Sequence, residues 1–229
     1  MNKECVVLGL NWKRIGGWSA ILLSVQLVII TSIIMLFLYP GGYDFWGVKI
    51  SWIGYSEVYG VPTPLNWFLY ATTTTLGAAL LIVFLFSWRT VFTETTLSKA
   101  LCWIGAIFGL VGALFWAVSA IFAGNLYGNI HNLGAEFFWL FATVAVVIYS
   151  IAILLKKDYG YFYALIGILP VLIFGVHVSG IFFGSAEVAL QKVGFYMIPF
   201  YFALQGFGLL RYSRKFAEVQ ATAGHHLEE

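Results

Sequence analysis

The sequence predicts an all-α, polytopic membrane protein built as a bundle of six transmembrane helices. Hydrophobic residues make up 61% of the chain and charged residues only 10%, against roughly 25% in soluble domains, so lipid must solvate much of its surface. Six apolar stretches each reach the length of about 20 residues that a helix needs to cross the hydrocarbon core. The lysines and arginines fall almost entirely in alternate gaps between these stretches. The predicted spans are Trp18–Tyr39, Leu65–Trp88, Ala100–Phe122, Gly134–Leu155, Tyr161–Phe183 and Val193–Tyr212.

The first span is predicted to be a retained helix. It is too long for the core of a signal peptide, and the segment Tyr39–Gly42 follows it where a cleavage site would need small residues. In the third span, Gly105 and Gly109 allow two helices to approach closely, and we favour packing inside the bundle over a dimer interface. The short turn Lys156–Asp158 predicts that the fourth and fifth spans are antiparallel neighbours.

The distribution of positive charge predicts the orientation of the chain. Positive residues accumulate in the cytoplasmic loops of membrane proteins, and ten of the twelve basic residues lie in one set of alternate segments. Both termini are therefore predicted to be cytoplasmic, in a multi-pass protein of the plasma membrane. Residues 1–215 form the single transmembrane domain, and residues 216–229 form a flexible cytoplasmic tail. The ten predicted cytoplasmic residues are Lys3, Lys13, Arg14, Arg89, Lys99, Lys156, Lys157, Arg211, Arg214 and Lys215, and the two outer ones are Lys49 and Lys192.

Residues 40–64 form the one substantial segment that is predicted to lie outside the membrane. This segment is rich in glycine and in aromatic side chains, which favour the membrane–water interface. We therefore expect it to fold over the outer mouth of the bundle. It is either an aromatic belt that anchors the protein or a lid over a site, since loops of this length are often functional. Tyr43, Asp44 and Trp46 are its candidate ligand-binding residues.

The segment Gly41–Gly54 also carries a family resemblance. Its pattern GGY-x6-IS-xx-G is similar to the Gly-Tyr…Ile-Ser-Asp-Leu-Gly loop that follows the first helix in an uncharacterised family of prokaryotic six-helix membrane proteins. That family is distantly similar to the damage-regulated autophagy modulator proteins. Asn66, His131 and Glu187 are partial matches elsewhere, whereas Trp52 stands where the family has aspartate. The resemblance implies a six-helix architecture and brings no established activity.

A few polar residues within the predicted spans mark a candidate pocket. Ionisable groups in hydrocarbon are costly and face the bundle interior or a cavity. Glu136 and His177 lie in the outer half of the fourth and fifth spans, and Asn66 and His131 lie at the outer ends of the second and fourth. We expect these faces to converge on a polar axis that widens outward. The alternative for each residue is an ordinary structural role, such as a core histidine bonded to a backbone carbonyl.

The sequence shows no recognisable cofactor chemistry. It contains no haem, nucleotide or iron–sulfur motif, no catalytic triad and no zinc motif. Cys5 and Cys102 are its two cysteines, and His131 and His177 are the candidate metal ligands. The net charge of +2 argues against nucleic acid as a main partner.

Three functions stay open from the sequence. The first is a non-enzymatic bundle that binds a small molecule or a lipid in an outer pocket covered by the 40–64 loop. The second is an accessory or structural subunit of a membrane complex. The third is a metal-dependent membrane hydrolase that uses Glu136 or Asp44 as a base and His131 or His177 as a metal ligand. We rank them in this order and lean against an enzyme, with the lipid bilayer as the partner common to all three.

Overall fold

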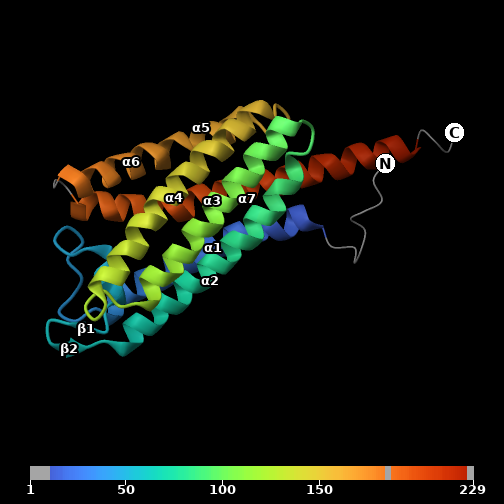
Figure 1. The fold of residues 1–229 in the computed structure, drawn as a ribbon. Coiled ribbons are helices and arrows are strands. Elements are labelled where there is room, and N and C mark those ends of the chain that lie inside the picture. The colour runs from blue at the N-terminus through green and yellow to red at the C-terminus, as the bar shows by residue number, and fades with distance from the viewer. Residues whose placement is uncertain (1–10, 184–186, 226–229) are drawn as a thin grey trace.

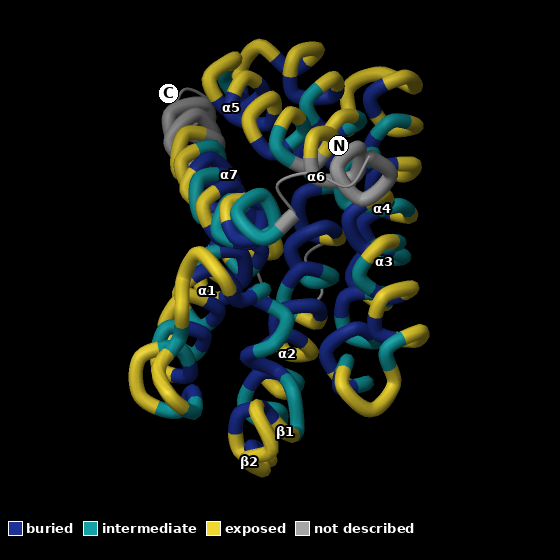
Figure 2. The backbone as a smooth tube through the Cα atoms, turned by 90° about the vertical axis from the view of Figure 1, so that its left-hand side faces the viewer, coloured by how far each residue is buried: buried dark blue, intermediate teal, exposed yellow. Residues whose placement is uncertain are grey.

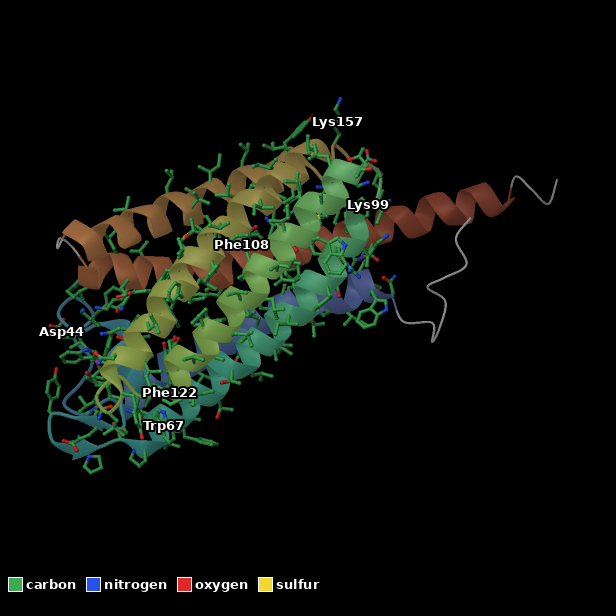
Figure 3. The ribbon with its side chains drawn as sticks, in the orientation of Figure 1. Asp44, Trp67, Lys99, Phe108, Phe122 and Lys157 are labelled. Carbon is green, nitrogen blue, oxygen red and sulfur yellow. The ribbon has the colours of Figure 1, made fainter. Side chains whose placement is uncertain are left out.

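The computed structural model describes residues 11–183 and 187–225, with side chains described for residues 11–173, 175–176 and 188–215. Figure 1 shows an elongated bundle of helices, with both described ends of the chain at one end of it. Lys99 and Lys157 mark this basic end, and Asp44 marks the opposite, loop end (Figure 3). The helices are α1 (Trp12–Ile33), α2 (Pro64–Trp88), α3 (Thr96–Ile121), α4 (Gly128–Leu155), α5 (Tyr161–Ile166), α6 (Ile168–Phe183) and α7 (Glu187–His225). Shorter elements are η1 (Ile34–Leu38), η2 (Ile50–Gly54), η3 (Arg89–Val91), β1 (Glu57–Val58) and β2 (Val61–Pro62).

The predicted all-α, membrane-type architecture is confirmed. Within the described residues, five helical stretches are long and apolar enough to cross a membrane, and a shorter apolar stretch covers Tyr161–Ile173. These lengths match the thickness of the hydrocarbon core. The five long stretches are Trp12–Leu38, Pro64–Val91, Thr96–Ile121, Gly128–Leu155 and Val188–Lys215.

The predicted fifth span, Tyr161–Phe183, is divided into α5 and α6 by a break at Gly167. Pro170 explains the break, because proline has no N–H to donate to the carbonyl four residues earlier. The amide of Gly167 instead donates to the carbonyl of Ala164 at 3.0 Å, which is the tighter spacing of a 3₁₀ turn. The chain therefore passes from α5 to α6 with a single non-helical residue between them.

Helices α1, α3, α4 and α7 extend several residues beyond their predicted ends. Asn11 caps α1, because its side-chain oxygen accepts the backbone N–H of Arg14 at 3.2 Å, so the helix begins at Trp12 rather than Trp18. The last helix, α7, continues to His225. Residues 216–225, which were predicted to form a flexible tail, continue α7, and alanine, glutamate and glutamine before Gly224 favour helix.

The long helices close into a ring. Helix α1 packs between α2 and α7, α3 packs between α2 and α4, and α6 packs between α4 and α7. Figure 2 shows that the buried parts of these helices turn toward one another while their exposed parts form the outside. The bundle thus buries one stripe of each helix and leaves the opposite stripe for lipid.

Glycines set the closest helix crossings. A Cβ on Gly206 of α7 would lie 2.7 Å from the carbonyl oxygen of Gly17 on α1. A Cβ on Gly134 of α4 would lie 2.8 Å from the backbone nitrogen of Ser119 on α3. Both contacts are backbone to backbone, so neither helix can move away to admit a methyl group without opening the crossing. Small residues at such positions are typical of membrane helix packing.

The glycines of the third span pack inside the bundle, as predicted. A Cβ on Gly105 would lie 3.0 Å from the ring of Tyr149, and one on Gly109 would lie 2.7 Å from Leu85. These glycines therefore face α4 and α2. They do not form an exposed dimer surface.

The 40–63 loop folds back onto the end of the bundle, as predicted. Strands β1 and β2 form a small hairpin, and its turn residues Tyr59 and Gly60 both have positive φ angles, 53° and 79°, as a type I′ turn requires. Helix η2 buries Ile50 and Ile53 against α2 and α7. The loop is thus a packed cap that shares the hydrophobic core of the helices.

Candidate functional site

A buried lysine lies at the loop end, in the second turn of α7. Lys192 is only 1% exposed, and its Nζ atom has no hydrogen-bond acceptor in the described part of the chain. The ammonium lies over two aromatic rings, 4.8 Å from the ring centroid of Phe45 and 5.3 Å from that of Tyr43. Such cation–π contacts compensate part of the loss of hydration, but lysine is almost never fully buried unless it is paired. Lys192 therefore offers three N–H donors that no described acceptor uses.

The cover over Lys192 is a compact turn, residues 43–48. The Tyr43 hydroxyl donates to the Val48 carbonyl at 3.0 Å, and the Trp46 N–H donates to the Asp44 carboxylate at 2.9 Å. Backbone N–H groups of Trp46 and Gly47 hold the pKa of Asp44 below its ordinary value, and the nearby charge of Lys192 lowers that pKa further. Gly47 fits here because a Cβ would overlap the Asp44 carboxylate.

The turn is held to the bundle more weakly than the rest of the loop. The Ile50 N–H donates to the side-chain oxygen of Gln191 at 3.0 Å, and the Ser56 N–H donates to that of Asn125 at 3.1 Å. No described hydrogen bond joins residues 43–47 to a helix. Their attachment to α7 is through the aromatic rings that lie over Lys192.

The structure brings two of the predicted loop residues to this site. Tyr43 contacts Lys192 directly, and Asp44 lies close enough to feel its charge. Trp46 is 74% exposed and packs edge-on against Phe45 with ring centroids 5.1 Å apart. Trp46 therefore lies on the outside of the turn rather than over the lysine.

Asn66 and His131 hold the loop end together. Asn66 is buried and donates its amide N–H to the carbonyl of Leu38 at 3.1 Å, which ties the start of α2 to the end of η1. Nδ1 of the buried His131 lies 2.6 Å from the carbonyl oxygen of Ser119. Its ring also packs edge-on against Tyr55. Both side chains thus have the structural role that was the alternative for them.

The prediction that Glu136 faces the bundle interior is wrong. Glu136 is exposed and shares its side of α4 with the exposed Leu133 and Leu140. The physical reason is the packing of Gly134 against α3. Residues in a helix are about 100° apart, so two residues after Gly134 the side chain points about 200° away from α3. The expected convergence of Glu136 with Asn66 and His131 does not form.

The second candidate metal ligand, His177, has its backbone in α6, but its side chain lies outside the described residues. Among the residues that are described, no group of three histidine, cysteine, aspartate or glutamate side chains could hold a metal ion. His131 already uses one ring nitrogen toward Ser119. The described side chains therefore give the hydrolase hypothesis no metal site.

The sequence interpretation missed Lys192 as a site residue and counted it only as an outer charge. One signal for it was present, since Lys192 directly precedes a predicted span on the side where lysine is rare. The aromatic cover was not predictable, because Tyr43 and Phe45 lie about 150 residues earlier in the chain. Only the folding of the loop onto α7 brings them together.

A second buried cluster lies nearer the basic end. The rings of Trp88 and Tyr149 stack with centroids 4.2 Å apart, and the Tyr159 hydroxyl donates to the Gln205 carbonyl at 3.2 Å. A cavity of about 30 Å³ lies beside Trp88, Tyr149 and Tyr201. It is lined almost entirely by apolar atoms and is about large enough for one water molecule. We interpret this cluster as packing between helices.

No protein-family model, curated protein or solved structure matches the chain. The resemblance of residues 41–54 to a six-helix family therefore stays a prediction. The surroundings of Lys192 are the basis for the function proposed below.

Proposed function

We propose that the protein is a six-span protein of the plasma membrane, with both termini in the cytoplasm, that binds an anionic small molecule or lipid headgroup at Lys192 beneath the 40–64 loop. The observation that carries this proposal is the burial of the Lys192 ammonium without a described acceptor. The orientation is supported by the ten basic residues of the alternate segments. Helices α5 and α6 together would form the fifth of these six spans.

The chemistry of the site favours a phosphate or a carboxylate. The ammonium would form a charge-assisted hydrogen bond of about 2.7–2.9 Å with either group. Burial raises the pKa of Tyr43 above its ordinary value, so its hydroxyl stays neutral, and its single proton remains donated to the Val48 carbonyl. Phe45 and Tyr43 would remain beside the ligand as apolar walls.

The ligand would enter by displacement of the 43–47 turn. Gly41 and Gly42 precede this turn with φ angles of 74° and 86°, and a Cβ at either position would contact nothing within 4 Å. Glycine visits many backbone conformations at little cost, so these two residues form a natural hinge. Phe45 is 41% exposed, so one of the two rings over the ammonium also faces the exterior.

Lys192→Gln tests the proposal, with Lys99→Gln at the opposite, exposed end as the matched control. The purified protein is titrated with dioleoylphosphatidylglycerol, dioleoylphosphatidylcholine and glycerol 1-phosphate, and thermal stabilisation is recorded. We expect one of the two anionic probes to stabilise the native protein and the Lys99 variant, and to have about tenfold lower affinity for the Lys192 variant. Equal binding to all three proteins, or no stabilisation by either anionic probe, would overturn the proposal.

The exposed carboxyl of Glu136 favours a second candidate function, that of an accessory subunit. A charged side chain on a lipid-facing surface is costly, and the exposed Leu133 and Leu140 lie on the same side of α4 as Glu136. A basic residue on a partner helix would remove that cost. Co-purification from mild detergent tests this function, with a stoichiometric partner expected for the native protein and lost for Glu136→Leu. A homogeneous single chain in both preparations would reject it.

A further inference from the structure

A groove runs along the outside of α1 from the basic end toward the middle of the bundle. Its volume is about 820 Å³, within the range of about 300–1,000 Å³ for ligand pockets. Arg14 and Asn11 lie at its basic end, and Leu22, Val25 and Leu80 form its apolar floor. The groove therefore changes from polar to apolar along its length, as a phospholipid does.

The dimensions of the groove fit one leaflet. From Arg14 to Val25 the helix rises about 16 Å at 1.5 Å per residue, and one leaflet contributes about 15 Å to the hydrocarbon core. Trp18 lies between them, is 56% exposed, and has the amphipathic ring that prefers the level of the headgroups. An acyl chain lying along α1 would thus end near the middle of the membrane.

The charge at the polar end selects the headgroup. Arg14 is exposed, and its guanidinium has no acidic partner in the described part of the chain. Its neighbour Lys13 lies over the ring of Tyr212, 5.3 Å from the centroid, and adds positive charge to the same end. Arginine binds phosphate through two parallel N–H donors.

We propose that this groove between α1 and α2 binds an anionic phospholipid from the leaflet at the basic end, with the phosphate at Arg14 and an acyl chain along Trp18, Leu22 and Val25. This site is independent of Lys192. Only the naming of its leaflet as cytoplasmic rests on the proposed orientation, and that leaflet is the anionic one.

The test is native mass spectrometry of the full chain in mixed micelles with dioleoylphosphatidylglycerol or dioleoylphosphatidylcholine. Arg14→Gln should weaken retention of the anionic lipid about tenfold and that of phosphatidylcholine less, because the choline ammonium offsets the charge of its phosphate. Val25→Phe, which fills the groove without changing charge, should weaken both lipids. Arg211→Gln, an exposed arginine at the same end on α7, should change neither.

Several results would overturn the inference. An equal loss in the Arg14 and Arg211 variants would show general attraction to a basic surface, and unchanged retention in the Arg14 and Val25 variants would show that the groove is not used. If inorganic phosphate alone displaces the lipid, the ligand of this site is a free anion and not a phospholipid. The Lys192→Gln background separates the two sites, because a failure of the Lys192 proposal leaves the effect of Arg14→Gln in place.

Discussion

Replacement of Lys192 by methionine should stabilise the ligand-free protein while it abolishes anion binding. Methionine is unbranched and fills a similar space with no charge. The native ammonium is 1% exposed and has no described acceptor. If Lys192 serves binding, its replacement should raise the stability of the protein and remove anion binding. If Lys192 is purely structural, its replacement should lower the stability.

The magnitude follows mainly from two opposing terms, because Asp44 is exposed and solvent screens its attraction for Lys192. Burial of an ion costs several kcal/mol even after relaxation. The contacts of the Lys192 ammonium with Phe45 and Tyr43 return roughly 1–2 kcal/mol each. The difference favours methionine by about 1–2 kcal/mol, which corresponds to a rise in the unfolding midpoint of roughly 2–8 °C for a chain of this size.

The assay is thermal unfolding in detergent, followed by tryptophan fluorescence, for the native protein and Lys192→Met. Lys99→Met serves as the control, and because Lys99 is exposed its change should stay within about 0.5 kcal/mol. A lower midpoint for the Lys192 variant would refute the reasoning. It would mean that the cation–π contacts outweigh the loss of hydration and that Lys192 serves to hold the loop.

Three further predictions concern the surroundings of the site and the bundle, and each is checked by thermal unfolding. Gly206→Ala should destabilise the protein by about 2–4 kcal/mol, because its Cβ would lie 2.7 Å from a backbone oxygen. The nearest contacts of a Cβ on Gly112 are at 3.4 Å, so Gly112→Ala should stabilise the protein by about 0.5–1 kcal/mol. Asn66→Ala should cost about 1–2 kcal/mol, because the part-buried carbonyl of Leu38 loses its donor, and should leave anion affinity unchanged. The pKa of Asp44 is lowered in the folded state, so its stabilising effect is complete above about pH 4 and is lost as pH falls through the lowered value. Asp44→Asn should remove this acid-dependent loss, and an unchanged acid profile would contradict the role of its turn.

The fold class was predictable because the thickness of the hydrocarbon core sets the length of apolar stretches. Helix ends were less predictable, because polar caps extend helices past their apolar runs. Asn11 starts α1 six residues before the predicted span, and Thr95 caps α3 through the N–H of Ser98 at 3.0 Å. The effect of Pro170 was local and therefore readable in principle, since a missing N–H must interrupt the helix one turn earlier.

The candidate site depended on facts that helical phase alone does not supply. Phase gives the relative positions of residues on one helix, but the neighbouring helix decides which face is inside. Gly134 turns toward α3, so Glu136 turns toward lipid. Lys192 shows the converse, because a residue at the edge of a span became buried when a distant loop folded onto it. The cost of burying a charge could mark such a residue as unusual, but only tertiary contacts show which side chains cover it.

The charged group is buried in one of the two proposed sites and exposed in the other. Their binding affinities should therefore respond differently to ionic strength. Asp44 and Glu57 are exposed at the loop end while Lys192 is buried and Lys49 is half-buried, so the fully exposed charges described there are acidic and do not attract an anion. A buried pair is also screened little by salt, and affinity at Lys192 should therefore change little as salt rises from about 0.05 to 0.5 M. Arg14 is exposed, and lipid retention in its groove should weaken over the same range. A parallel loss at both sites would mean that the anion at the loop end binds an exposed charge rather than the buried ammonium.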